Sequence, residues 1–164
     1  MITIKKAREQ DLETVRSLAY KIWPDTYREF LSDHQIDYML DKMYNKGELL
    51  SQLQKGYIFL IAEDENQEIG FAGYSVSDSE NHIYKLHKLY ILPSVQGKGI
   101  GKLLINEVAD HAKRAGAQFL QLNVNRNNKA KEFYEKAGFY IKETVDLDIG
   151  NGFFMNDYVM EKTL

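Results

Sequence analysis

A short glycine-rich stretch is the first place where this sequence could do chemistry. VQGKGIGKLL, residues 95–104, places three glycines within five positions and then turns into an apolar run that favours a helix. Glycine costs backbone entropy and is typical of places where the backbone must come close to a bulky polar group. Free amides and the positive end of the helix dipole would point the same way, which predicts an anion site with phosphate as the natural ligand.

The spacing of the loop excludes two familiar phosphate-binding motifs. A dinucleotide-binding loop would need a glycine three residues after Gly99, where Lys102 stands. A P-loop would need Ser or Thr after Lys102, where the chain has Leu103. A plain strand-to-helix connection with flexible glycines stays open as the alternative.

Composition narrows the class of protein. The chain has 164 residues, of which 44% are hydrophobic, and this predicts a single domain over residues 1–164 with a sizeable core. The net charge of −3 disfavours a nucleic-acid partner and leaves room for cationic ligands. Without cysteine, disulfides, thiolate metal sites and a thiol nucleophile are excluded. No apolar run reaches the roughly 20 residues of a membrane span, and the N-terminus lacks a signal-peptide core, so a soluble cytoplasmic protein is expected.

The pattern of apolar residues predicts one α/β domain that can position such a loop. Runs with a period of two predict strands, and i, i+3, i+4 spacing predicts helices. The predicted strands are residues 2–7, 57–62, 68–76, 82–93, 119–125, 139–148 and 153–162, of which the second to fourth should be antiparallel neighbours. The predicted helices are a run from Leu12 to Ile22, one that follows Ser32, then 47–54 and 101–115, and about nine residues that end at Gly138.

Two polar side chains predict where the first helices begin. Asp11 stands just before the first apolar helical run and is a plausible cap. Ser32, with Gln35 three residues later, forms a capping-box pattern.

Two motifs resemble those of the GNAT acyltransferase superfamily. LYILPSVQGKGIGKLL is similar to motif A, whose pattern Gln/Arg-x-x-Gly-x-Gly/Ala is met by Gln96, Gly99 and Gly101. NNKAKEFYEKAGF resembles a second motif, which is met by Asn127, Ala130, Tyr134, Gly138 and Phe139. The stretches WPDTY, LHKLYILP, DIGNG and DYVMEKTL look most like the branch that contains spermine/spermidine acetyltransferases. The resemblance implies a mixed, mostly antiparallel sheet flanked by helices, with splayed central strands.

The resemblance also implies acetyl-CoA as co-substrate. Free groups near Leu89, Tyr90 and Ile91 would bond the pantetheine and polarise the thioester, because the family's central strands splay apart there. Asn127 would bond the pantetheine arm. Lys136 would lie near the nucleotide phosphates or be an ordinary solvated lysine. The residues whose loop amides would hold the pyrophosphate are Gln96, Gly97, Lys98, Gly99, Ile100, Gly101 and Lys102.

Transfer to an amine needs two proton movements. A primary amine has a pKa near ~10 and must lose a proton, whereas a leaving thiolate must gain one. Tyr134 is the candidate acid, and a core tyrosine is the alternative because the residue lies on the apolar face of its helix. His87 is the candidate base, with water or a structural histidine as the alternatives. By strict alternation His87 and Lys85 share the side of their strand with Leu89 and Ile91, which is expected to face the acceptor.

An acidic stripe bears on the acceptor. Asp25, Glu29, Asp33, Asp37 and Asp41 recur at every fourth residue, and the last three share one face of a predicted helix. In the superfamily the first two helices border the acceptor site, so the stripe would suit a polycation. A solvated helix face is the alternative.

These features predict direct acetyl transfer from acetyl-CoA to a primary amine, without a metal. A polyamine is the favoured acceptor, and a peptide or protein N-terminus is the enzymatic alternative. A non-catalytic acyl-CoA-binding sensor on the same scaffold is the alternative from a different class. No nucleic-acid or membrane partner is expected, and open strand edges with the C-terminal hairpin would allow a homodimer.

Overall fold

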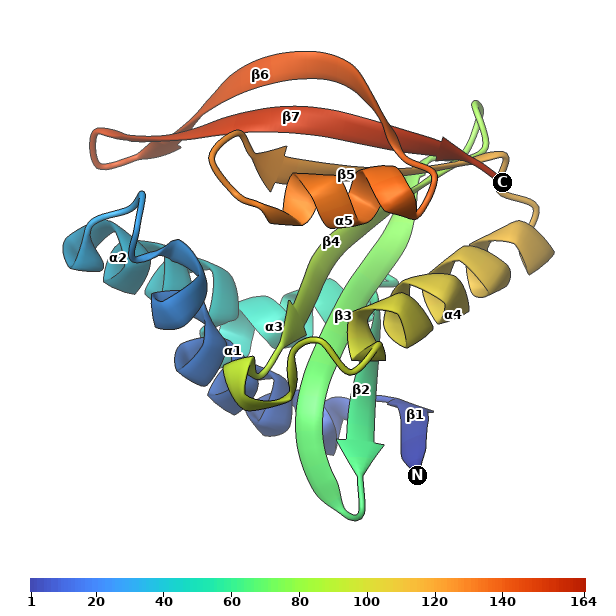
Figure 1. Cartoon of the computed structure of the whole chain (residues 1–164), viewed down its shortest axis with the longest axis horizontal. Coiled ribbons are helices and arrows are strands. Elements are labelled where there is room, and N and C mark those ends of the chain that lie inside the picture. Colours follow the sequence, from blue (N-terminus) through green and yellow to red (C-terminus); the bar gives the residue numbers. More distant parts are fainter.

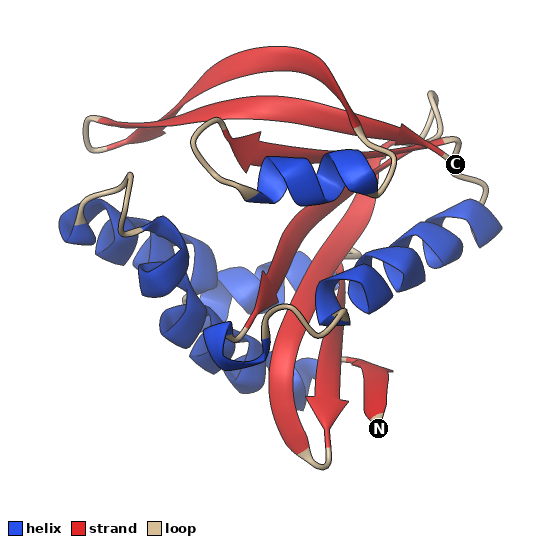
Figure 2. Cartoon of the chain, viewed as in Figure 1, coloured by secondary structure: helices blue, strands red, loops and turns tan.

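The architecture is a twisted sheet with helices on both faces (Figures 1 and 2). A computed structural model describes residues 1–164. The sheet has seven strands in the order β1-β2-β3-β4-β5-β7-β6, and β4 with β5 is its parallel pair. The strands are β1 (Ile2–Lys6), β2 (Ile58–Asp64), β3 (Gln67–Asp78), β4 (Ile83–Ile91), β5 (Phe119–Asn125), β6 (Tyr140–Gly150) and β7 (Phe153–Thr163). The helices are α1 (Leu12–Tyr27), α2 (Asp33–Tyr44), α3 (Lys46–Gln54), α4 (Ile100–Arg114) and α5 (Ala130–Lys136).

The helices divide the core into two parts. Helices α4 and α5 cover one face of the sheet, where Leu104, Val108 and Met160 are buried. Helices α1, α2 and α3 cover the other face, where Ile22 and Met39 are buried. None of the helices combines the length and the apolarity that a membrane span requires. Every predicted element is present, and β2, β3 and β4 are antiparallel neighbours as predicted.

One of the two predicted helix caps is confirmed. Ser32 Oγ accepts a hydrogen bond from the Gln35 amide at 3.0 Å and begins α2, as the capping-box pattern indicated. Asp11 occupies the N-cap position of α1, as predicted, but its carboxylate accepts from the Arg8 amide at 2.8 Å and makes no capping hydrogen bond to α1. Asp11 therefore closes the short 3₁₀ turn that precedes the helix.

A bulge in β4 changes which side chains face which helices. The register with β3 pairs Tyr74 with Leu86 but Gly73 with Lys88, so one extra residue lies between them on β4. Such a bulge reverses the alternation of side chains along a strand. Leu86 and, after the bulge, Leu89 face the α4–α5 side, whereas Lys88 lies among rings on the α1–α3 side.

The prediction that His87 and Lys85 share a side with Leu89 and Ile91 is therefore wrong. His87 stacks on Tyr57, which packs on the α1–α3 side of the sheet. Strict alternation holds only in a regular strand, and the extra residue in β4 places Lys85 and His87 on the opposite face from the later odd-numbered positions.

Strands β4 and β5 diverge halfway along their length. Their pairing runs from Ile83 opposite Phe119 only to Leu86 opposite Leu122, and Figure 1 shows the two strands separating beyond that point. Strand β4 stays paired with β3, and β5 stays paired with β7. Beyond the last shared pair, the edges of β4 and β5 that face each other have no strand partner, which leaves backbone groups free to bind a ligand.

Candidate active site

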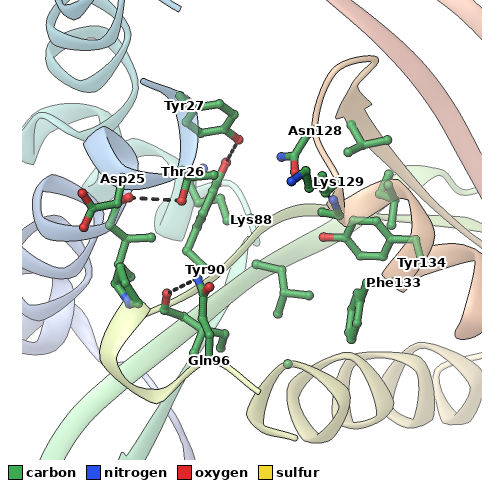
Figure 3. Close-up of a pocket in the computed structure, with 18 of the residues that line it drawn as sticks. Asp25, Thr26, Tyr27, Lys88, Tyr90, Gln96, Asn128, Lys129, Phe133 and Tyr134 are labelled. Atoms are coloured by element: carbon green, nitrogen blue, oxygen red, sulfur yellow. Dashed lines mark hydrogen bonds between the residues drawn. The ribbon is translucent and has the colours of Figure 1, made fainter. Parts of the chain in front are cut away.

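A cavity of about 810 Å³ lies where β4 and β5 separate. Its walls come from the end of α1, the second half of β4, residues 93–102, the end of β5, and α5 with the turn before it. Figure 3 shows Tyr134 on one side of this cavity and the Tyr27–Tyr90 pair on the other. The volume is typical of a pocket for a small molecule or cofactor.

The glycine loop forms an anion cradle at one end of this cavity. Gly97 and Gly99 have φ angles of +84° and +80°, a left-handed conformation that glycine adopts without steric strain. The backbone amides of residues 97–102 donate to no acceptor within the protein, and Gly99 is the N-cap of α4. Unpartnered amides at the positive end of a helix suit a phosphate group, so the residues present fit the pyrophosphate of a CoA thioester.

Gly101 allows a close approach of two helices. It lies within α4, and a Cβ atom there would lie 3.4 Å from Cζ of Phe133 on α5. A larger side chain at Gly101 would therefore separate α4 from α5. Gln96 closes the base of the loop, since its Nε2 donates to the Ile91 carbonyl at 3.4 Å.

The structure brings most of the predicted site residues to this cavity. The predicted site residues that line the cavity are Leu89, Tyr90, Ile91, Gln96, Gly97, Gly99, Ile100, Gly101, Lys102, Asn127, Tyr134 and His87. Lys98 and Lys136 do not line it, and Lys136 is exposed on α5. Lys102 and Lys129 are the cavity lysines near the loop and α5.

Tyr134 is held as a protonated phenol inside the cavity wall. Its side chain is buried, and its ring packs edge-on against Phe133 and Phe139. Burial raises the pKa of the Tyr134 hydroxyl well above its ordinary value, so the group stays protonated at neutral pH. The side chain thus packs as the core tyrosine of the alternative interpretation while its hydroxyl lines the cavity.

His87 has the surroundings of a hydrogen-bonded structural histidine. Its Nε2 lies 2.8 Å from Ser75 Oγ, and its ring stacks on Tyr57 with centroids 4.4 Å apart. Burial, followed by the charges of Lys88 and Lys85, lowers the pKa of His87 to about 3. A neutral imidazole of such low basicity is a weak proton acceptor.

Lys88 is a buried cation that the sequence analysis missed. Its Nζ lies 5.3 Å from the ring centroid of Tyr44 and donates to Gln52 Oε1 at 3.1 Å. Burial lowers its pKa to about 8. Nothing in the alternating pattern of β4 indicated burial, because the bulge that turns Lys88 inward has no sequence signature of its own.

Another missed feature is an aromatic pair at the end of α1. The hydroxyls of Tyr27 and Tyr90 are 2.8 Å apart, and both side chains line the cavity.

The acidic stripe has two parts with different surroundings. Asp25 and Glu29 line the cavity, whereas the three acidic residues of α2 do not.

The α2 part of the stripe does not border the site, contrary to the expectation. Asp33, Asp37 and Asp41 are exposed, because Ile36 and Met39 of the same helix turn inward to the core. Residues spaced four apart share a helix face, so the three carboxylates lie together on the solvent side.

Comparison with known proteins identifies the fold and the family. The family model for the acetyltransferase (GNAT) domain matches residues 55–141. A spermidine N(1)-acetyltransferase from Thermoplasma acidophilum is 30% identical over 98% of this chain and 96% of its own length. The crystal structure of the PaiA N-acetyltransferase from the same organism, in complex with coenzyme A, superposes with a TM-score of 0.83 at 28% identity. That match covers 100% of this chain and 99% of the other.

A third relative has a different type of acceptor. A [ribosomal protein bS18]-alanine N-acetyltransferase from Haemophilus influenzae is 37% identical over 93 residues, which are 57% of this chain and 62% of the relative. The glycine loop and the splayed strands lie within or beside the matched domain. By its sequence and its fold, this chain belongs to the GNAT family of N-acetyltransferases.

Proposed function

We propose that the protein transfers an acetyl group from acetyl-CoA to a primary amine of a small molecule, with a polyamine as the favoured acceptor. One observation carries the proposal: a loop of unpartnered amides, two unpaired strand edges and a protonated tyrosine meet in a single cavity. The near-full-length similarity to a spermidine N(1)-acetyltransferase supports the choice of acceptor.

The chain's own residues suit each part of such a donor. The amides of residues 97–102 would hold the pyrophosphate, and Asn127 would bond the pantetheine arm. The unpaired edge of β4, at Leu89, Tyr90 and Ile91, would bond pantetheine amides and polarise the carbonyl. Acetyl-CoA supplies the thioester, whose carbonyl carbon forms a bond to the amine nitrogen as its bond to sulfur breaks.

In this proposal Tyr134 completes the transfer. Its hydroxyl would donate a proton to the departing sulfur, and burial keeps that proton in place until the thiolate forms. The amine must also lose a proton. Water is the better carrier than His87, because the His87 ring is engaged by Ser75 and Tyr57 and has low basicity.

Two other functions fit parts of the observations. Acetylation of a peptide N-terminus is favoured by the partial similarity to a ribosomal-protein alanine acetyltransferase. A non-catalytic acyl-CoA sensor would use the same loop and strands, and the presence of Tyr134 in the cavity argues against it.

A thiol-release assay separates the three functions. The purified protein is given acetyl-CoA with spermidine, spermine, a peptide that carries an N-terminal alanine, and simple monoamines. We expect the highest kcat/KM with a polyamine. A higher value with the peptide would assign the protein to N-terminal acetylation, and tight CoA binding without turnover of any amine would indicate a sensor.

A further inference from the structure

A second cavity, of about 270 Å³, opens on the α1–α3 side of the sheet. Helices α1 and α2, strands β4, β5 and β7, and the C-terminal hairpin supply its walls. The hairpin is fixed over α2 by a hydrogen bond of 2.9 Å from the Tyr38 hydroxyl to the Ile149 carbonyl, and Figure 1 shows its tip beside that helix. The residues that this cavity shares with the first are Tyr27, Leu86, His87, Lys88, Tyr90 and Asn123.

The buried side-chain atoms that lack a hydrogen-bond partner belong to residues that line this second cavity. Four buried side-chain atoms lack a hydrogen-bond partner: Trp23 Nε1, Asn123 Oδ1 and both carboxylate oxygens of Asp157. All three residues line the second cavity. Buried polar atoms are normally paired, so a group of orphans at one place indicates a ligand. Three of these four atoms are acceptors, and the ligand should therefore be a donor.

Asp157 is the strongest of these indications. The residue is 1% exposed, and its carboxylate forms no ion pair, with the Asn123 side chain as its nearest hydrogen-bonding group. The guanidinium of Arg126 is engaged by Asp146 and by the Val145 carbonyl. Burial raises the pKa of the Asp157 carboxyl, and this outweighs the lowering by a hydrogen bond with the Asn123 side chain and by the charges of Lys85 and Arg126. An ammonium group would supply the missing donors and the missing charge.

The rest of the cavity wall suits a carbon chain. Met39, Met155, Phe154 and Tyr44 present apolar and aromatic surface. Such surface accommodates methylene groups, and aromatic faces also attract a cation. A ligand with an ammonium group at the end of a methylene chain therefore matches both the walls and the orphaned acceptors.

We propose that this second cavity holds the non-reacting, positively charged arm of the acceptor, with its ammonium group paired to Asp157. This inference rests on the proposed function, and it adds a specificity-determining residue on β7. Tyr134 lines only the first cavity and Asp157 only the second, so a nitrogen held by Asp157 is remote from the reacting carbonyl. The shared residues at the separation of β4 and β5 form the passage between the two ends of the acceptor.

Lys85 is the competing cation within the chain. It lines the same cavity, and its charge lowers the pKa of Asp157 without forming an ion pair. If Asp157 serves only to balance Lys85, its loss should destabilise the protein and leave acceptor binding unchanged. If Asp157 binds the acceptor, removal of the Lys85 charge should strengthen acceptor binding.

The test compares spermidine with butylamine, which has one reactive amine and no second charge. We expect Asp157→Asn to raise the KM for spermidine by about tenfold or more, and to change the KM for butylamine and for acetyl-CoA by less than about twofold. Lys85→Met should lower the KM for spermidine. Glu161→Gln is the matched control, because Glu161 is a buried acid on the same strand that Gln121, Tyr140 and Lys142 already satisfy.

Two outcomes would overturn the inference. An equal rise in KM for both amines would place Asp157 at the reacting nitrogen, and an unchanged KM for spermidine would leave it a structural carboxylate. Calorimetric titration of spermidine into the protein with CoA present makes the same comparison without turnover. Weaker binding to Asp157→Asn than to the wild type and Glu161→Gln would support the site even if no amine is acetylated, so the inference and the proposed function fail separately.

Discussion

Burial determines the protonation state of the side chains nearest to the cleft. Tyr134 and His87 are both removed from water, and burial is the largest cause of both pKa shifts. The shifts act in opposite directions, because burial disfavours the charged form of each group. The tyrosine keeps its proton and the histidine stays without one, which suits Tyr134 as a donor and leaves His87 a weak base.

We expect Tyr134→Phe to lower kcat by about 10²-fold or more and to leave acetyl-CoA affinity nearly unchanged, because only the proton to the leaving sulfur is lost. Steady-state kinetics and calorimetry measure the two effects. Tyr20→Phe is the control, since Tyr20 is 38% exposed on α1 and lines neither cavity. Near-normal turnover of Tyr134→Phe, with chemistry rate-limiting, would make Tyr134 a core residue only.

His87→Gln tests the role of the histidine, because glutamine can still hydrogen-bond to Ser75. The folded-state pKa of about 3 lies below the usual 6.5, so the unfolded state binds more protons between these values. Stability through His87 is therefore present above pH ~6.5 and is lost as the pH falls towards 3. We expect the Tm of the wild type to fall more steeply over this range than that of His87→Gln.

The same variant decides the question of the base. If His87 is structural, the pH profile of kcat/KM keeps its shape in His87→Gln. A loss of activity that is largest below pH ~8 and is relieved at higher pH would restore His87 as the general base.

Among the elements, the backbone conformation of the glycine loop and the rotation of α2 about its axis determine which groups face the cavity. Gly99 has a left-handed φ and caps α4, so the loop amides point to one place. The acidic residues of α2 are spaced evenly, but the helix turns them to solvent.

We expect Gly99→Ala to weaken CoA binding at least tenfold, because the left-handed φ of +80° is unfavourable with a Cβ and the cradle would rearrange. Gly116→Ala is a matched control, since Gly116 has a φ of +96°, equally open surroundings and no contact with the cavity. Both variants should lose about 1 kcal/mol of stability. Equal CoA affinity in the two variants would contradict the assignment of the anion cradle.

Charge neutralisation on the two parts of the acidic stripe should have different effects. Asp25→Asn with Glu29→Gln should raise the KM for spermidine at low salt, and the effect should shrink at ~0.15 M salt because exposed charges are screened. The triple change of Asp33, Asp37 and Asp41 to Asn should leave the KM for spermidine unchanged. The reverse order of effects would show that the polycation approaches along α2.

In the molecule as a whole, two cavities lie at the separation of β4 from β5 and share part of their walls. In the proposed function, the donor lies against α4 and α5, and the acceptor arm lies against α1, α2 and the C-terminal hairpin. A buried carboxylate without an ion-pair partner lowers stability, and proteins keep such groups where function requires them.

We therefore expect Asp157→Asn to raise the Tm by about 2–4 °C at pH 7. Tyr27, Lys85, His87, Asn123 and Arg126 surround or influence this carboxyl, and burial still raises its pKa. The folded state then binds more protons above the unfolded pKa of ~3.9, so the wild type loses stability as the pH rises. The advantage of the variant should vanish below that pH, and a variant that is less stable at pH 7 would show that Asp157 is already satisfied.

Local sequence patterns predicted the elements, their order and the glycine loop that lines the first cavity. Local patterns carried this information: alternating strands, helical apolar faces, the Ser32 cap and the glycines from Gly97 to Gly101 are all encoded within a few consecutive residues. The two family motifs fixed the fold because each combines several residue types at set spacings. The family comparison confirmed that assignment.

The features behind the proposed acceptor side arise from tertiary contacts. The bulge in β4 reverses the faces of the residues from Lys88 onward relative to His87, and it appears only in the pairing of β4 with β3, which neither strand shows alone. The burial of the Asp157 carboxylate without an ion-pair partner depends on the pairing of β7 with β5 and on a cavity wall shared with α2. These segments are far apart in the chain. Burial and pairing are properties of contacts between distant segments, and for that reason no local pattern distinguished Asp157 from an ordinary strand residue.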